Sequence, residues 1–355
     1  MDHSARALAS LPQPFSRTEA LAAGVTEWSV RACLTSRSLI TLGKGLYAVR
    51  EPWLAESQWA RHRQMAVAAA RLTPDAIVSH ASGAALLGLP HPAYAPDKVA
   101  MTLLDDVRTS RRDSWRRFHR GRTPPDHVLI RHGVPGLVAA RVVIDSGREV
   151  HGRDALAIAD GAVRTGLVDF DELLDMRCHQ RHWPGIAATN QILLLVDGRR
   201  ENWLESASAW SMSRWDLPMG IPQVNVFTPD GEFVGRPDVL WPDHGLVGEA
   251  DGVGKYLVDG ATDDAVRALL GRETVREAGM AELGLEVIRW TPSESILGDA
   301  IHTRFTQSAD ASRGSRVRAV FRCTCCNHPL EECVVEAELL VWRRRVVRLL
   351  ERRVW

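Results

Sequence analysis

The chain has 355 residues, of which 45% are hydrophobic and 25% are charged, a composition typical of a globular protein with two or three domains. The formal net charge is zero, so overall basicity does not indicate a nucleic-acid-binding protein, and a basic surface would have to come from local segregation of charge. The sequence has no run of 18 apolar residues, and its first residues lack the pattern of a secretory signal. We therefore expect no membrane span and a cytoplasmic protein.

The first expected domain, residues 1–58, has the order helix, turn, helix, hairpin. Ser16 and Thr26 are hydroxyl residues that precede two helical segments, the second running over about 27–36. Two apolar segments around Gly43-Lys44-Gly45 then predict a β-hairpin. This order is typical of a winged helix-turn-helix, which binds DNA. Its candidate nucleic-acid-binding residues are three cations: Arg31, Arg37 and Lys44. The apolar residues expected to pack from the second helix are Trp28, Val30, Ala32 and Leu34.

The middle region, residues 59–198, mixes helical and strand patterns. The expected helices cover residues 59–72, 81–88, 154–164, 171–178 and 186–195. The expected strands cover residues 99–104, 128–131 and 142–145. His80 precedes a helix of small residues, a place that favours a buried hydrogen-bonding or capping histidine over a catalytic one.

The third expected domain, residues 199–304, has the order α-β-β-β-α-β. Its segments are a helix over 203–215, strands over 223–227, 233–241 and 246–251, a helix over 263–283 and a strand over 285–290. Strand alternation places Asp238 on one face of the second strand, and Glu249 with Asp251 on one face of the third. Since a short turn joins these strands, their carboxylates are expected to meet, which is how proteins hold Mg²⁺ for phosphodiester chemistry.

Lys255 follows this group of acids closely. The chain has only three lysines against 41 arginines, so a lysine close to these acids is unusual for this sequence. Lysine has a compact charge and an adjustable pKa, which arginine lacks. We therefore include Lys255 among the candidate catalytic residues.

These residues carry a resemblance to known families. Glu205, Asp238 and the run Glu249-Ala-Asp251-Gly252 resemble the restriction-endonuclease-like fold with its PD-(D/E)xK motif, and more closely a domain of unknown function related to very-short-patch-repair endonucleases. The first domain resembles the winged-helix domain of AbiEi-type antitoxins, through Ala23-Gly24-Val25 and Gly45-Leu46-Tyr47-Ala48. The expected fold class is therefore a mixed α/β multidomain protein with an N-terminal winged helix-turn-helix, an α+β middle region and a C-terminal restriction-endonuclease-like αβββαβ core.

The resemblance, which spans about residues 10–300, implies a metal site. Asp238 and Glu249 would bind Mg²⁺ or Mn²⁺, with the main-chain carbonyl of Ala250 as a further ligand. Glu205 would be an outer metal ligand, and Gln223 would position the phosphate or a water molecule.

The sequence departs from the orthodox motif at one position. Asp251 stands where the motif has its lysine, and Lys255 comes four residues later. Two alternatives stay open: Lys255 reaches back to the phosphate, or the site lacks the lysine altogether.

Three functions follow as hypotheses. The favoured one is a Mg²⁺-dependent DNA endonuclease targeted by its winged helix, in which a homodimer would allow both strands to be cut. The alternative is a DNA-binding transcriptional regulator of antitoxin type with a catalytically degenerate nuclease-like domain; such a regulator would have a toxin or regulatory protein as its unknown partner. The third is a scaffold that binds protein and shows no salt-dependent affinity for DNA. A fold alone does not decide among them.

The last segment, residues 305–355, is rich in cysteine and arginine. Cys323, Cys326, His328 and Cys333 are candidate zinc ligands, and the first two have C-x-x-C spacing. A second, well-separated ligand pair is missing, so we do not expect zinc here. The arginines of residues 341–355 are compatible with a basic helix on DNA or with a disordered extension.

Overall fold

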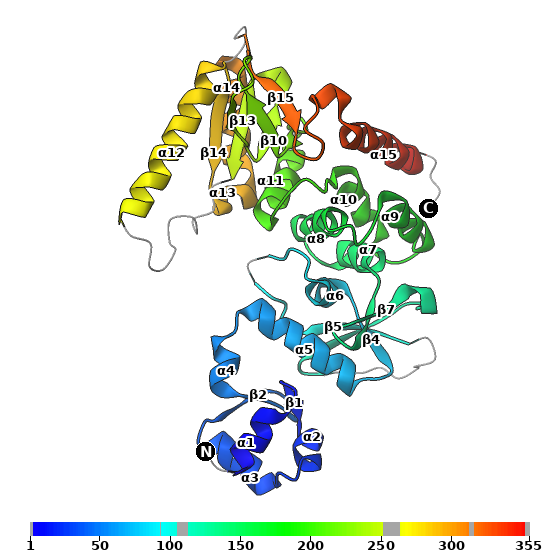
Figure 1. Ribbon diagram of the computed structural model, residues 1–355. Helices are drawn as coiled ribbons and strands as arrows, with labels where there is room; N and C mark the ends of the chain where they lie inside the picture. The colour runs from blue at the N-terminus through cyan, green and yellow to red at the C-terminus, as the bar shows by residue number, and fades with distance from the viewer. Residues whose placement is uncertain (1–2, 93, 105–112, 251–262, 312–315, 352–355) are drawn as a thin grey trace. The chain divides into compact units, whose positions relative to one another are not determined.

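The computed structural model describes all residues except 1–2, 93, 105–112, 251–262, 312–315 and 352–355, and it does not describe the side chains of 3, 263–270, 272 and 311. The protein is a mixed α/β protein with several sheets, and it divides into an N-terminal unit, Met1–Val150, and a C-terminal unit, His151–Trp355 (Figure 1). Within the described ranges, no helix has both the length and the apolar character needed to cross a bilayer.

The N-terminal unit begins with a helical part closed by a small sheet. Its elements are α1 (His3–Ser10), β1 (Phe15–Ser16), α2 (Arg17–Ala22), α3 (Glu27–Thr35), β2 (Leu39–Gly43), β3 (Leu46–Val49) and α4 (Arg50–Ala55). Ser16 and Glu19 form a capping box on α2, and Thr26 caps α3 by accepting from the amide of Ser29 at 3.1 Å. The three strands pair in the order β1-β3-β2. The predicted helix, turn, helix and hairpin are thus confirmed as elements.

The core of this part is small and apolar. It consists of Leu8, Phe15, Ala20, Val25, Val30 and Leu39. Val30 is buried as expected and Leu34 packs beside this core, but Trp28 is 78% exposed and Ala32 is exposed. The packing prediction was wrong for these two residues because the helical period places Trp28 and Ala32 on the face opposite Val30 and Leu34.

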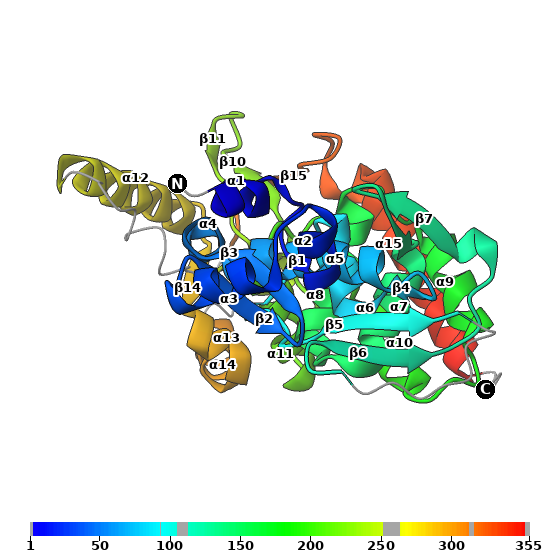
Figure 2. The same cartoon turned by 90° about the horizontal axis from the view of Figure 1, so that it is seen from below.

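The rest of the N-terminal unit is a five-stranded mixed sheet with helices. Its elements are α5 (Gln58–Leu72), β4 (Ala76–Val78), α6 (His80–Leu87), β5 (Val99–Leu103), β6 (Arg116–Arg120), β7 (Val128–Arg131), β8 (Val134–Leu137) and α7 (Ala139–Glu149). The strand order is β6-β5-β4-β8-β7, and the pair β5 and β6 is parallel (Figure 2).

Residues 142–145, predicted as a strand, belong to helix α7. Their β-branched side chains favour a strand locally, but packing decides. Arg141 and Asp145 form a buried i,i+4 ion pair at 2.7 Å, a spacing that only a helix brings together. Gly83 of α6 lets Val142 approach closely, since a Cβ on Gly83 would lie 2.7 Å from Val142 Cγ2. Tertiary contacts that the local pattern does not show therefore select the helix.

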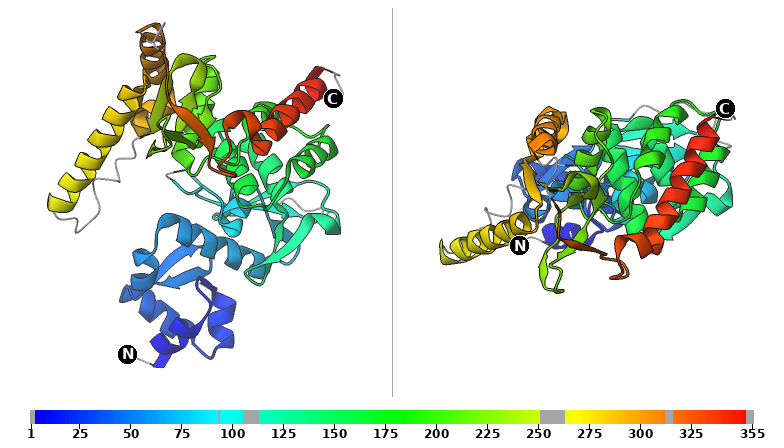
Figure 3. Two further views of the ribbon diagram at one scale, coloured as in Figure 1. Left: turned by 45° about the horizontal axis from the view of Figure 1, so that its top comes forward. Right: turned by 90° about the horizontal axis from the view of Figure 1, so that it is seen from above.

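The C-terminal unit opens with helices. They are α8 (Gly152–Arg164), α9 (Phe170–His179), α10 (Thr189–Leu195) and α11 (Trp203–Arg214). The last helix of the unit, α15 (Val334–Glu351), lies beside α10, and its red ribbon runs along the green helices in Figure 3. Trp342 of α15 is buried there, donates from Nε1 to the carbonyl of Leu193 at 2.7 Å and stacks on Phe170 at 4.9 Å.

Two sheets complete this unit. Their elements are β9 (Ile221–Pro222), β10 (Val224–Phe227), β11 (Phe233–Gly235), β12 (Val239–Trp241), β13 (Leu246–Ala250), α12 (Asp263–Glu282), β14 (Glu286–Trp290), α13 (Pro292–Leu297), α14 (Asp299–Ala311) and β15 (Val320–Cys323). One sheet has the order β14-β13-β12-β9 and the other β11-β10-β15. β13 and β14 are parallel neighbours, and α12 lies between them in the chain.

One predicted strand is broken in the structure, and another begins one residue later than expected. The segment 233–241 forms β11 and β12, which belong to different sheets, because Pro237 cannot donate to a strand ladder. The segment 223–227 begins as a strand only at Val224, because Gln223 has a left-handed backbone with φ 54°. The sequence pattern showed neither the break nor the later start.

A glycine substitution tests the close packing of α6 on α7. We expect Gly83→Val to lower the free energy of unfolding of the N-terminal unit by about 2 kcal/mol, because the stiff Val142 side chain leaves no room. The matched change Gly271→Val in α12 meets no atom within 4 Å and should alter stability by about 0.5 kcal/mol or less. Urea unfolding of both variants measures the difference, and equal effects would contradict the packing argument.

Candidate functional site

The acidic site consists of Glu205, Gln223 and Asp238, which come from three separate segments of the C-terminal unit. Glu205 lies in the first turn of α11, Gln223 lies between β9 and β10, and Asp238 directly precedes β12. Gln223 Nε2 donates to Glu205 Oε2 at 3.1 Å and to Asp238 Oδ1 at 3.3 Å. The amide of Gln223 also donates to the main-chain carbonyl of Asp238 at 3.2 Å. One glutamine side chain therefore bridges two carboxylates.

Burial controls the charge of Glu205. Its side chain is held by the amide of Glu201 at 3.0 Å and by Nδ2 of Asn202 at 2.5 Å, and the residue is only 6% exposed. Burial, followed by the nearby charge of Asp238, raises the pKa of Glu205 to about 7. A carboxyl group with this pKa exchanges its proton near neutral pH and would also accept a cation in place of that proton.

Gln223 brings a second unusual feature to the acidic site. The residue is 4% exposed, and its Oε1 atom has no hydrogen-bond partner among the described residues. A buried carbonyl oxygen without a partner is costly, so such an atom calls for an explanation. An oxygen ligand beside two carboxylates suits a hard divalent cation or its bound water.

Asp238 is tied to the neighbouring strand. Its Oδ2 accepts from the main-chain amide of Ala250 in β13 at 2.7 Å. This bond places the carboxylate at the end of the β12–β13 ladder, beside the residue whose carbonyl the family resemblance implies as a metal ligand.

Glu249 points to the α12 side of the sheet and forms an ion pair there. It lies in β13 on the same face as Val247, and Val247 packs with Leu240 and with Met280 of α12. Glu249 Oε2 is 3.1 Å from Nη2 of Arg276. Ala250 points to the other face, where Trp290 and residues of α11 pack. The structure thus brings Glu205, Gln223 and Asp238 together and places Glu249 in an ion pair with α12.

Two further predicted catalytic residues, Asp251 and Lys255, fall in 251–262, outside the described residues. Within the described part of the chain, no group of three His, Cys, Asp or Glu ligand atoms within 4.8 Å of one another includes Asp238 or Glu249. Glu249 as the partner of Asp238 at a metal therefore stays a prediction.

A cavity of about 460 Å³ lies next to the acidic site. Its wall includes Glu205 and Asp238, apolar residues of α11 such as Met212, and Arg343 of α15. Arg343 is mostly buried and lies 3.7 Å from Asp197. Arg343 was not predicted as a site residue, because nothing in the local pattern places the tail at this cavity.

The three predicted nucleic-acid-binding cations are on the surface of the N-terminal unit. Arg31 on α3 has a side chain that is 80% exposed, Arg37 follows α3, and Lys44 is exposed in the β2–β3 turn. Exposed Trp28 shares the outward face of α3 with Arg31. An aromatic ring and cations on one surface can contact bases and phosphates.

A second polar group in the N-terminal unit was not anticipated. His80 and His119 stack with ring centroids 3.8 Å apart, and their Nε2 atoms lie 3.7 and 3.4 Å from Glu149 Oε2. His80 Nδ1 is also 2.9 Å from Ser79 Oγ. Burial and then His119 lower the pKa of His80 to about 3, so this ring is neutral. A buried, hydrogen-bonded His80 agrees with the role that its position favoured.

Comparisons with known proteins give relatives but no function. No family model matches the chain. It is 28% identical over 149 residues to the Uncharacterized protein MT2308 of Mycobacterium tuberculosis strain CDC 1551 / Oshkosh and to the Uncharacterized protein Rv2248 of strain ATCC 25618 / H37Rv. The match covers 42% of this chain and 52% of each relative, so the chain spans about half the length of these curated relatives.

Among solved structures, the chain is similar to the RV2827C protein of Mycobacterium tuberculosis. The similarity covers 62% of this chain and 82% of that one, with 15% identity and a TM-score of 0.35. A likeness this weak supports no conclusion about fold or function.

The raised pKa of Glu205 predicts a pH-dependent stability in EDTA. The folded pKa is about 7 and the unfolded one about 4.5, so the folded protein binds more protons between these values. Stability should therefore fall as pH rises from 4.5 to 7, by about 3 kcal/mol in total at about 1.4 kcal/mol per pKa unit. Urea unfolding at pH 5 and pH 8 measures this change.

The variant Glu205→Gln should lose most of this pH dependence, because an amide does not titrate. Glu201→Gln, four residues earlier and exposed, serves as the matched control and should keep most of the pH dependence, because the charge of Glu201 is the smallest of the causes that raise the pKa of Glu205. An equal change in the free energy of unfolding between pH 5 and pH 8 in Glu205→Gln and in the unchanged protein would show that another group is responsible.

Proposed function

We propose that this protein is a divalent-metal-dependent DNA endonuclease whose reaction takes place at the acidic site. The observation that supports this most is the pair of carboxylates, buried Glu205 and partly buried Asp238, which share one amide donor at the wall of a cavity. Two acids held this close repel each other, and a cation would relieve that repulsion.

The order of elements supports a restriction-endonuclease-like core. Helix α11 precedes the strands, α12 connects the parallel neighbours β13 and β14, and the two helices cover opposite faces of the β14-β13-β12-β9 sheet (Figure 1). Five strands, β9 to β13, follow α11, and β10 and β11 belong to the second sheet. The expected αβββαβ order is obtained when β9/β10 and β11/β12 are each counted as one strand.

The residues of the acidic site fit Mg²⁺ or Mn²⁺. Carboxylate oxygens of Asp238 and Glu205 are hard ligands, and Gln223 Oε1 adds a buried oxygen with no partner among the described residues. When bound, the metal would polarise the scissile phosphate and lower the pKa of a water molecule.

The protein's own groups then have definite tasks. Gln223 fixes the separation of the two carboxylates through its Nε2 atom, and Asn202 and the Glu201 amide orient Glu205. Arg343, on the wall of the same cavity, would donate hydrogen bonds to a phosphate oxygen. The apolar wall around Met212 limits access of water, which strengthens each of these contacts.

The N-terminal unit supports a targeting role. The order α2, α3, β2, β3 is that of a winged helix-turn-helix, with α3 as the recognition helix and the β2–β3 turn as the wing tip. Arg31, Arg37 and Lys44 are all exposed on these elements. DNA is the partner that this arrangement suits best.

One observation favours the alternative of a regulator without cleavage. Glu249, the acid that the family motif places at the metal, is buried and ion-paired with Arg276. A glutamate neutralised in this way is less available to a metal, so a degenerate nuclease-like domain is the second candidate. The regulator would bind DNA as well but would not cut it.

Cleavage assays with Asp238→Asn separate the two functions. We expect the unchanged protein to nick or linearise supercoiled plasmid with Mg²⁺ or Mn²⁺ and to do nothing with EDTA. Asp238→Asn should reduce the rate by about 100-fold or more, because it removes a metal ligand worth several kcal/mol in the transition state. DNA affinity should stay nearly the same.

The matched control is Asp243→Asn in the exposed turn before β13, which should cleave normally. Cleavage by Asp238→Asn at the normal rate would contradict the assignment of the acidic site as the cleavage site. Binding by every protein with no cutting by the unchanged one would favour the regulator.

Salt dependence tests the surface cations. The triple variant Arg31→Ala/Arg37→Ala/Lys44→Ala should weaken DNA binding and reduce the slope of log K against log salt by about 1 for each phosphate that the variant no longer neutralises. Fluorescence anisotropy with a duplex at several salt concentrations measures the slope. Arg63→Ala/Arg131→Ala, two exposed cations of the same unit, should leave it nearly unchanged. Equal slopes for the unchanged protein and the triple variant would place the DNA-binding surface elsewhere.

A further inference from the structure

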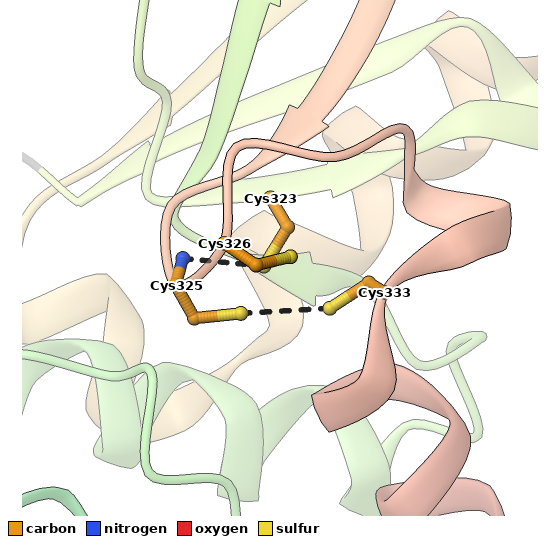
Figure 4. Close-up of side chains that lie close together, drawn as sticks. All are labelled: Cys323, Cys325, Cys326 and Cys333. Carbon is orange, nitrogen blue, oxygen red and sulfur yellow. Dashed lines mark hydrogen bonds between the residues drawn. The ribbon is translucent and has the colours of Figure 1, made fainter.

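Four cysteines of the C-terminal unit lie together where β15 ends and α15 begins (Figure 4). This cysteine cluster consists of Cys323, Cys325, Cys326 and Cys333, and all four sulfur atoms are within 4.8 Å of one another. Cys325 Sγ and Cys333 Sγ are 3.5 Å apart. Thiol sulfurs are soft ligands that select zinc over Mg²⁺ or Ca²⁺.

The loop of the cysteine cluster is closed by main-chain bonds. Cys323 donates from its amide to the carbonyl of His328 at 2.9 Å, and the amide of Asn327 donates back to the carbonyl of Cys323 at 2.9 Å. Asn327 has φ 58°, the left-handed conformation that such a tight reversal requires. The turn therefore presents three cysteines to one point.

A main-chain donor is already aimed at sulfur in this loop. The amide of Cys325 lies 3.2 Å from Cys323 Sγ. Such N–H to sulfur bonds stabilise a thiolate and orient it as a ligand. Cys333 adds the N-terminus of α15, whose partial positive charge also favours an ionised sulfur.

Both halves of the cysteine cluster are anchored independently. Cys323 pairs with Val224 in the β10–β15 ladder, and α15 is held by Trp342 on Leu193 and by the ion pair of Glu336 with Arg199 at 2.7 Å. Cys323 and Cys333 are each 1% exposed. The fold thus brings the four thiols together at fixed anchor points.

The distances favour a metal over disulfides. A tetrahedral zinc with Zn–S bonds of about 2.3 Å separates its sulfurs by about 3.8 Å. The observed 3.5 Å and the limit of 4.8 Å bracket that value, whereas a disulfide needs about 2.05 Å. All four cysteines are free thiols in the structure.

We propose that the cysteine cluster binds one zinc ion in a closed, four-thiolate structural site. From the sequence we expected no zinc and grouped His328 with three of these cysteines. In the structure Cys325 takes that place, and His328 contributes its main-chain carbonyl to Cys323. With four protein ligands, the zinc has no open position for substrate and does not take part in catalysis.

The proposed zinc ties the C-terminal helix to the sheet. It joins β15, which pairs with β10, to α15, which lies on α10. Because Arg343 of α15 lines the cavity of the acidic site, the zinc also holds this helix next to it. The zinc proposal does not depend on endonuclease activity.

Metal analysis of the full chain tests the proposal. Protein purified under reducing conditions should contain about one zinc per chain by inductively coupled plasma mass spectrometry. Cys325→Ser and Cys333→Ser should each lose most of it. The matched control Cys178→Ser, an exposed thiol on α9, should keep it.

Cobalt gives a readout that does not need the variants to fold. The metal-free, reduced full chain titrated with Co²⁺ should develop the sulfur-to-cobalt charge-transfer band and intense visible bands of a tetrahedral thiolate site, saturating at about one equivalent. The absence of these bands would overturn the proposal. So would equal zinc in Cys325→Ser and Cys178→Ser, or disulfides within the cysteine cluster by mass spectrometry of the freshly purified protein.

Discussion

The repulsion between the buried carboxylate of Glu205 and the partly buried carboxylate of Asp238 is the constraint on which the acidic site depends. Glu205 and Asp238 share a single donor, Gln223 Nε2, and burial denies Glu205 the water that would otherwise screen its charge. Burial and the charge of Asp238 therefore raise the pKa of Glu205 to about 7. A proton on Glu205 or a bound cation would relieve this repulsion, and both would use the same arrangement of side chains. A site of this kind responds to pH and to metal through one equilibrium.

The same two strand interruptions separate the two sheets of the C-terminal unit and position residues of the acidic site. Gln223 separates β9 from β10 through its left-handed backbone, and Pro237 separates β11 from β12. Because the breaks lie side by side, joined by the bond from the Gln223 amide to the Asp238 carbonyl, the strands before and after them enter different sheets. Gln223 and Asp238, two of the three residues of the acidic site, stand at these breaks. A strained backbone position beside chemistry-bearing side chains is common at functional sites.

The sequence predicts features that local signals determine, and it does not predict features that depend on tertiary packing. Caps at Ser16 and Thr26 act within a few residues, so the helices they start were predicted correctly. The helix at 142–145 and the outward position of Trp28 depend on packing partners and on the phase of the helix, which the local pattern misjudged. Glu205, Gln223 and Asp238 were grouped through a family resemblance, but the left-handed backbone of Gln223 has no sequence signal. Cys325 was left out because spacing rules count pairs along the chain, whereas folding closed a turn that gathered four thiols.

The acidic residues on the two faces of the β14-β13-β12-β9 sheet have different hydrogen-bond and ion-pair partners. This difference favours the α11 face as the proposed metal site. On the α12 face, Arg276 neutralises Glu249 within the fold, so that carboxylate already has its counter-charge. On the α11 face, Glu205 receives neutral donors from Asn202, Gln223 and a main-chain amide, which orient it without cancelling its charge. Neutral donors leave a carboxylate able to bind a cation, whereas a guanidinium competes with one. The cavity lies against the α11 face, so the side of the sheet that is prepared for a metal is also the side where a ligand has room.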